Sequence, residues 1–135
     1  MQNAAAVIYT SGFDFMHSNK PFALKEVVFR PIIEWVNEAL DSAGISDRCY
    51  VINEGEEEVK KYTGESPVFV RKAESGHPLY SAKEWMDENE AENFLAISAE
   101  AVFTNPDVLK AAFERHVSSN EKLTVIASAG RESFI

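Results

Sequence analysis

Short apolar runs that alternate with helix-like segments restrict the fold of this chain more than any other feature. The runs lie at residues 4–9, 49–52, 68–70, 94–97 and 123–127, and each is short enough for a buried strand. Strands that are separated by helices form right-handed crossovers and a mostly parallel sheet. We therefore expect a three-layer α/β/α fold with a Rossmann-like sheet.

Two helices are expected in the first half of the chain. The clearer one begins at Pro31, because proline suits a first helical position, and ends at Gly44. Asn53 is a candidate cap for a short acidic helix over residues 54–62, which Gly64 would end. Both helices would connect neighbouring strands.

Two more helices are expected in the second half. One begins near Ser81 and continues through Met86, and the other is opened by Pro106 with Thr104 or Asn105 as its cap. Helical spacing predicts the inner face of this last helix. That face would consist of Val108, Leu109, Ala112, Phe113, His116 and Val117.

The composition is typical of one compact domain that spans residues 1–135. The chain has 45% apolar residues and a net charge of −9, from 22 acidic and 13 basic residues. This balance argues against binding to nucleic acid or to an anionic membrane surface, which both require basic patches. It leaves nucleotide binding possible, because local dipoles and a few cations can outweigh net charge. We interpret the acidic patches at residues 56–58 and 87–92 as solvated helix faces.

Several features favour a cytoplasmic protein. Cys49 is the one cysteine and lies in an apolar run, so we expect a buried thiol in a reducing compartment. The first residues lack the pattern of a signal peptide, and no apolar run reaches the roughly 18 residues of a membrane helix.

Residues 131–135 end on two apolar side chains, which favours a boundary inside a longer fold, with a short docked tail as the alternative.

Ligands of open parallel sheets bind at the carboxyl ends of the strands, where the strand order reverses. Two loops qualify by position, residues 10–21 after the first strand and residues 98–105 after the fourth. We expect these two loops to converge on one crevice.

Four short patterns in the first third of the chain occur in an informative order. They are Thr10-Ser11-Gly12, Phe13-Asp14-Phe15-Met16, Pro21-Phe22-Ala23-Leu24 and Phe29-Arg30-Pro31. Their order and spacing resemble the opening of the uridyltransferase domain of bacterial N-acetylglucosamine-1-phosphate uridyltransferases, which are sugar nucleotidyltransferases. Residues 76–77, 98–103 and 105–106 continue the resemblance over nearly the whole chain, which would match the first part of such a domain. The resemblance implies an incomplete fold of the nucleotide-diphospho-sugar transferase type.

The resemblance also implies a reaction, in which UTP and a sugar 1-phosphate give a UDP-sugar and pyrophosphate with Mg²⁺. It places Ser11, Gly12 and Lys20 near the nucleotide phosphates, Gly76 near the base and Glu100 at the metal. No catalytic residue is assigned. Gly12 as a tight-turn residue and Glu100 as an exposed loop carboxylate are the alternative interpretations.

Departures from the family pattern fall at the charge-neutralising positions. Phe15 and Phe22 stand where the family has arginine and lysine, and Asp14 adds a negative charge beside them. Nucleotidyl transfer depends on positioning and on neutralising phosphate charge. Two hypotheses follow, a degenerate nucleotidyltransferase and a non-catalytic pseudoenzyme or assembly domain, and for the chemistry we favour the second. Formation of a homo-oligomer is left open.

Overall fold

The computed structural model describes residues 4–11, 13–14, 20–71, 77–101 and 104–125. The predicted positions Gly12, Phe15 and Gly76 lie outside these ranges.

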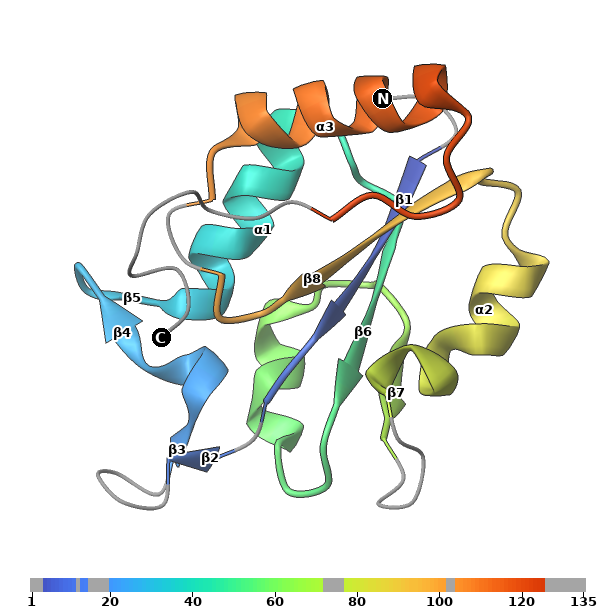
Figure 1. The fold of residues 1–135 in the computed structure, drawn as a ribbon. Helices are drawn as coiled ribbons and strands as arrows, with labels where there is room; N and C mark the ends of the chain where they lie inside the picture. Colours follow the sequence, from blue (N-terminus) through green and yellow to red (C-terminus); the bar gives the residue numbers. More distant parts are fainter. Residues whose placement is uncertain (1–3, 12, 15–19, 72–76, 102–103, 126–135) are drawn as a thin grey trace.

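A four-stranded parallel sheet forms the centre of the fold (Figure 1). Its strands are β1 (Ala4–Tyr9), β6 (Arg48–Ile52), β7 (Val68–Val70) and β8 (Asn93–Ser98). The order across the sheet is β7-β6-β1-β8, and all three pairings are parallel. The chain therefore adds β6 and β7 on one side of β1 and then places β8 on the other side. The predicted α/β class and parallel sheet are confirmed.

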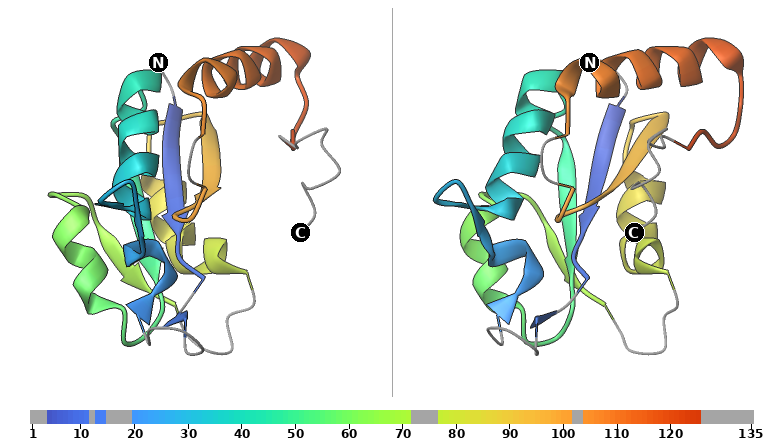
Figure 2. Two further views of the ribbon diagram at one scale, coloured as in Figure 1. Left: turned by 90° about the vertical axis from the view of Figure 1, so that its left-hand side faces the viewer. Right: turned by 60° about the vertical axis from the view of Figure 1, so that its left-hand side comes forward.

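Helical segments cover both faces of the sheet (Figure 2). On one face lie α1 (Ile32–Ala43), α3 (Pro106–Ser119) and the 3₁₀ helices η1 (Phe22–Leu24) and η2 (Glu57–Tyr62). The other face carries the 3₁₀ helix η3 (Pro78–Ala82), which continues into α2 (Lys83–Glu88). Two small hairpins, β2 (Phe13–Asp14) with β3 (Lys20–Pro21) and β4 (Glu26–Val27) with β5 (Arg30–Pro31), precede α1.

The two faces of the sheet separate the core into two clusters. Ala6 and Ile8 of β1 pack in the larger cluster with α1 and α3, whereas Val7 packs on the opposite face with Cys49. This division follows from the alternation of side chains along a strand. Burial raises the pKa of the Cys49 thiol to about 12, so the expected buried and unreactive cysteine is confirmed.

The ends of α1 and α3 follow the predicted signals. Gly44 adopts φ of 81° after α1, a conformation that favours glycine, and its N–H donates to the Asp41 carbonyl. Asn105 caps α3, since its Oδ1 accepts from the Asp107 N–H at 2.8 Å and Pro106 takes the first helical position. Within the described ranges, none of the helices has the length and apolar character that crossing a membrane requires.

The two middle helices differ from prediction. The acidic helix over residues 54–62 is a 3₁₀ helix that begins at Glu57, because Asn53 and Glu56 close a tight turn before it. The helix expected from Ser81 begins earlier, as a 3₁₀ turn at Pro78. His77 caps that turn, with its Nδ1 accepting from the Leu79 N–H at 3.1 Å.

The inner face of α3 is narrower than the helical spacing predicts. Leu109 and Phe113 are buried, whereas Val108 and Val117 are 49% and 59% exposed. The reason is that α3 packs along one side against α1 and the edge of the sheet, so only a thin stripe of its surface is covered.

The strand expected at residues 123–127 is wrong for its described part. Residues 123–125 pair with no strand, and Leu123 and Val125 are 79% and 76% exposed. An apolar run becomes a strand only where its backbone finds hydrogen-bond partners, and these residues find none in the described sheet. Residues 126–127 lie outside the described ranges.

The packing of α3 leads to a paired prediction. Leu109→Ala should lower the free energy of unfolding by about 2–5 kcal/mol, because it leaves a cavity beneath the helix. Val117→Ala on the same helix should change it by less than about 0.5 kcal/mol, because Val117 is exposed. Urea denaturation of both variants measures the two values. Equal losses would contradict the observed face of α3.

Candidate functional site

The carboxyl ends of β6, β1 and β8 lie side by side at one edge of the sheet, because the three strands are parallel neighbours. The strand order reverses between β1 and β8, which is where ligands of such sheets bind. Polar side chains follow all three strands at this edge. We call them the strand-end cluster, which consists of Thr10, Ser11, Asn53, Glu56 and Glu100.

Backbone hydrogen bonds extend the strand pairing by one residue into this cluster. The Thr10 N–H donates to the Val51 carbonyl at 3.0 Å, and the Ala99 N–H donates to the Tyr9 carbonyl at 2.7 Å. The residues that directly follow β1 and β8 are therefore fixed by hydrogen bonds to neighbouring strands.

Glu56 is completely buried at the end of β6 and β1. Its Oε1 accepts a hydrogen bond from the Thr10 hydroxyl at 2.6 Å and another from the Asn53 N–H at 2.7 Å. The Asn53 side-chain amide also donates to the Thr10 carbonyl at 3.3 Å. The other carboxylate oxygen of Glu56, Oε2, is buried and has no partner among the described residues.

Glu100 repeats this pattern at the end of β8. The Ser11 hydroxyl donates to Glu100 Oε1 and so joins the carboxyl ends of the paired strands β1 and β8, while Glu100 Oε2 is buried without a partner among the described residues. The backbone N–H of Glu100 is fixed by a bond to Ser98 Oγ at 3.1 Å. Burial raises the pKa of the Glu100 carboxyl, the Ser11 hydrogen bond lowers it, and the negative charge of Glu56 raises it again.

The chemistry of this cluster suits a hard cation. Carboxylate oxygens are the ligands that Mg²⁺ and Mn²⁺ prefer, and the two buried oxygens of Glu56 and Glu100 are available to bind one. No group of three or more metal-binding side chains occurs in the part of the chain that the structure describes. A cation held here would therefore keep several water ligands, as Mg²⁺ commonly does.

The structure brings together two of the residues predicted from the sequence, Ser11 and Glu100. Lys20 is exposed in β3, paired in register with Asp14. Phe22, at the expected place of a lysine, is 36% exposed, and the Lys25 ammonium lies 5.9 Å from the centre of its ring.

Glu56 was missed by the sequence analysis, and its interpretation as part of a solvated helix face is wrong. Glu57 and Glu58 are exposed as expected, but Glu56 precedes the 3₁₀ helix and turns into the protein. The physical reason is the turn at residues 53–56, which directs the side chain to Thr10. Three consecutive glutamates give no sequence signal that one of them is buried while the other two are exposed.

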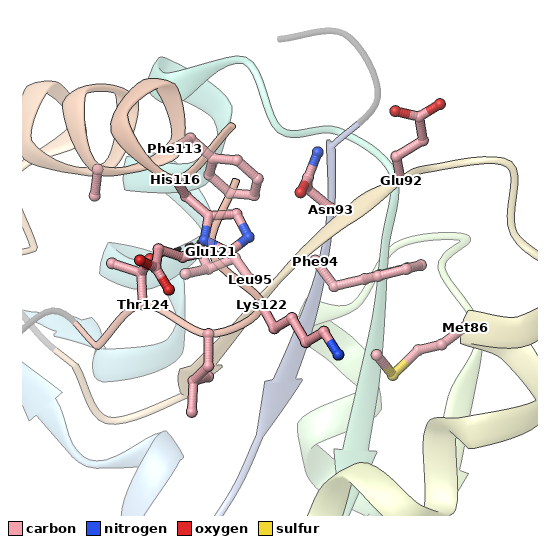
Figure 3. A pocket seen from close by; sticks show the side chains of 12 residues that line it. Met86, Glu92, Asn93, Phe94, Leu95, Phe113, His116, Glu121, Lys122 and Thr124 are labelled. Carbon is pink, nitrogen blue, oxygen red and sulfur yellow. Dashed lines mark hydrogen bonds between the residues drawn. The ribbon is translucent and has the colours of Figure 1, made fainter. Parts of the chain in front are cut away.

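A separate groove lies beside the amino-terminal half of β8 (Figure 3). Its volume is about 420 Å³, and Phe94, Phe113 and His116 are among the residues that line it. The ring nitrogen Nδ1 of His116 lies 2.8 Å from the Thr124 hydroxyl. Because the β8 residues that line it, Asn93 to Leu95, lie toward the start of the strand and Glu100 follows its end, the groove is distinct from the strand-end cluster.

Comparison with known proteins points to one group of enzymes. The bifunctional protein GlmU of Caldanaerobacter subterraneus subsp. tengcongensis is 25% identical over 132 residues. The match covers 95% of this chain and 28% of that protein, so the chain spans less than a third of the relative's length. No protein-family model matches the chain.

Solved structures with the same fold agree with this match. A nucleotidyl transferase from Methanothermobacter thermautotroptrophicus has a TM-score of 0.67 and 15% identity, over 84% of this chain and 58% of its own. The chain resembles the nucleotidyltransferases in sequence and in fold. A CMP:2-keto-3-deoxy-manno-octonic acid synthetase in complex with CTP has this nucleotidyltransferase fold too, with a TM-score of 0.65 and 17% identity over 87% of this chain and 48% of its own.

A further structure of the same fold was solved with a metal. The protein Rv0371C from Mycobacterium tuberculosis H37Rv, in complex with manganese, has a TM-score of 0.64 and 9% identity, over 85% of this chain and 59% of its own. A divalent metal is thus compatible with the nucleotidyltransferase fold.

The buried bond between Thr10 and Glu56 gives a prediction for this site. Thr10→Val should lower the free energy of unfolding by about 1–3 kcal/mol, because a buried carboxylate loses a donor that no water replaces. The control is Thr124→Val, since the Thr124 hydroxyl is exposed and its loss should change stability by less than about 0.5 kcal/mol. Chemical denaturation measures both. Equal stability of the two variants would mean that the Thr10 contact is absent.

Proposed function

We propose that this nucleotidyltransferase-like domain binds a nucleoside triphosphate at the carboxyl ends of β1 and β8 and has lost the transfer activity of its relatives. The observation that carries the proposal is the contact between Ser11 and Glu100 across the reversal of strand order. Ser11, Gly12 and Lys20 would lie near the phosphates, Gly76 near the base, and Glu100 near a Mg²⁺ ion. The proposal rests on the sequence match to GlmU and on a neighbour in fold that was solved with CTP.

The corresponding reaction is the one expected from the resemblance to uridyltransferases. A phosphate oxygen of the sugar 1-phosphate attacks the α-phosphorus of UTP, and the bond to pyrophosphate breaks. Mg²⁺ would supply charge neutralisation on the phosphates. The protein would supply positioning, through the rigid strand ends that hold Thr10 and Glu100.

The expected loss of activity follows from charge. Glu56 and Glu100 place two carboxylates at the strand ends, and Phe22 stands where a lysine would neutralise phosphate. Loss of one electrostatic stabiliser commonly reduces the rate about 100- to 1000-fold. The effects of groups that act together are not additive, so the combined loss is not the product of the single losses.

An assembly or interaction domain is the second candidate, and the β4–β5 hairpin favours it. Val28 and Phe29 form its tip with φ of 52° and 64°, and they are 67% and 93% exposed. A β-branched and an aromatic residue are unfavourable in this left-handed conformation and in water. A contact with a partner would explain why they are there. The expected cytoplasmic location and any homo-oligomer remain predictions.

Binding and turnover can be measured separately. Calorimetric titration of the protein with UTP and Mg²⁺ should give heat of binding at or below millimolar UTP. Glu100→Ala should weaken that binding, whereas Glu114→Ala, a change of an exposed carboxylate on α3, should leave it unchanged.

Incubation with UTP and N-acetylglucosamine 1-phosphate should yield no UDP-sugar above the level of Glu100→Ala. Absence of heat at millimolar UTP would contradict the binding proposal. Synthesis of UDP-sugar clearly above the variant would contradict the loss of catalysis.

A further inference from the structure

The outer edge of β8 is open among the described residues. In the sheet order β7-β6-β1-β8, β8 pairs with β1 alone. The Ala99 N–H donates to the Tyr9 carbonyl and so points toward β1. Because backbone groups alternate in direction along a strand, the N–H and C=O groups of Phe94 and Ala96 point away from β1. No described strand pairs with them, so this edge can take up another extended chain.

The two edges of the sheet differ in how well they are protected. At one edge β7 has three residues, whereas β8 at the other edge has six and carries no charged side chain. Exposed edge strands are commonly short or charged, because a long uncharged edge attracts another strand. The β8 edge has neither protection within the described ranges. Its length and composition suit a strand that is paired on both sides.

The groove beside the amino-terminal half of β8 lies at this edge (Figure 3). Phe94 and Met86 line it from the face of the sheet that carries α2, where the rings of Phe94 and Trp85 meet edge to face. Leu95 and Phe113 line it from the opposite face, which carries α3. Because the groove reaches both faces of β8, it can receive the alternating side chains of a strand beside β8.

Residues 121–124 restrict what can enter the groove. They follow α3 and line the groove together with β8, and Leu123 is 79% exposed. One extended segment needs only about 4.8 Å beside β8, and it would cover Leu123 as well. The edge of a second copy would bring its whole sheet and its helices against residues 121–124. A single extended segment therefore fits this space better than a second copy of the chain does.

The charges of the groove favour a basic segment. Two exposed carboxylates line it, those of Glu92 and Glu121, together with one ammonium, that of Lys122. The whole chain carries a net charge of −9. Basic side chains beside apolar ones complement this charge, whereas an acidic segment would be repelled.

We propose that the groove beside β8 binds an extended peptide segment of a partner protein, with apolar side chains flanked by basic ones, which adds to the sheet as a strand next to β8. The backbone of Phe94 and Ala96 supplies the hydrogen bonds, and Glu92 and Glu121 supply the complementary charge. The groove is separate from the strand-end cluster. The site therefore gives the domain an interaction function that requires no nucleotide.

A labelled peptide tests the site on the full chain. The probe is the hexapeptide Lys-Val-Leu-Val-Thr-Lys with fluorescein at its amino terminus, and fluorescence anisotropy measures its dissociation constant. We expect a constant below about 1 mM. Only alternate amides of a strand face its neighbour. N-methylation of one alternate set of peptide amides should therefore raise the constant at least about tenfold, and N-methylation of the other set should raise it less.

Ala96→Pro blocks the edge without breaking the sheet. The N–H that proline lacks points away from β1, and proline is tolerated at such positions of edge strands. The dissociation constant should rise at least about tenfold. Val70→Pro is the matched control at the opposite edge. The Arg71 N–H donates to the Ile52 carbonyl, so the Val70 N–H also points outward, and this variant should bind the peptide as the unaltered protein does.

Glu121→Lys tests the charge of the groove and leaves the backbone of β8 unaltered. It should raise the dissociation constant about threefold or more, because it reverses one of the charges that face the basic peptide. Glu114→Lys is its control, since Glu114 is exposed on α3 and does not line the groove. An equal effect of the two changes would contradict the role of charge in the site.

The inference is overturned by absence of binding at about 1 mM peptide, by equal affinities of Ala96→Pro and Val70→Pro, or by an equal effect of the two methylated peptides. Two further results would assign the edge to another occupant and contradict the inference. One is a dimer in sedimentation of the protein alone that Ala96→Pro dissociates, which would assign the edge to a second copy. The other is slow hydrogen exchange of the Phe94 and Ala96 amides without peptide in the monomer, which would assign it to the chain's own residues 126–135.

Discussion

The parallel pairing of β1 with two neighbours is the constraint on which the rest of the structure depends. In β1, Val7 lies opposite Cys49 of β6 on one side and opposite Ala96 of β8 on the other. A strand that is paired on both edges and buried on both faces must be almost entirely apolar. It also delivers its last residues, Thr10 and Ser11, to the same edge as the ends of its neighbours. The position of the candidate site is therefore a consequence of how the core is built.

The side chains at this edge carry a charge that the sheet alone does not compensate. Burying a carboxylate without its full set of partners lowers the stability of the fold. Glu56 and Glu100 are therefore unfavourable for stability unless they bind a ligand. Their hydrogen bonds to Thr10 and Ser11 reduce this cost, but they satisfy only one oxygen of each residue. The same negative charge would weaken the binding of phosphates unless a cation accompanies them. The proposed cation binding and the proposed loss of transfer activity would thus both follow from this one arrangement.

Much of the fold could be predicted from the sequence, because the signals that mark its strands and helix ends lie in the residues of those segments themselves. The runs that became β1, β6, β7 and β8 are apolar because both faces of the sheet are covered, and Gly44 and Asn105 mark helix ends through their own backbone chemistry. That Ser11 and Glu100 lie together could be predicted because the loops that hold them follow neighbouring parallel strands, whereas their roles in ligand binding come from the resemblance and stay predictions. Glu56 could not, because its burial depends on Thr10, which is 46 residues away. The run that begins at Leu123 shows the same limit, since alternation of apolar residues does not supply a strand with a partner.

A double-mutant cycle between Ser11 and Glu100 tests most directly whether the ends of β1 and β8 form one site. The free energies of unfolding of Ser11→Ala, Glu100→Ala and the double variant are compared with that of the unaltered protein, in a chelating buffer so that no bound cation contributes. The account predicts a coupling energy of about 1 kcal/mol, because one hydrogen bond to a carboxylate joins the two residues. Losses that add within about 0.3 kcal/mol would contradict it, since residues that do not touch behave additively.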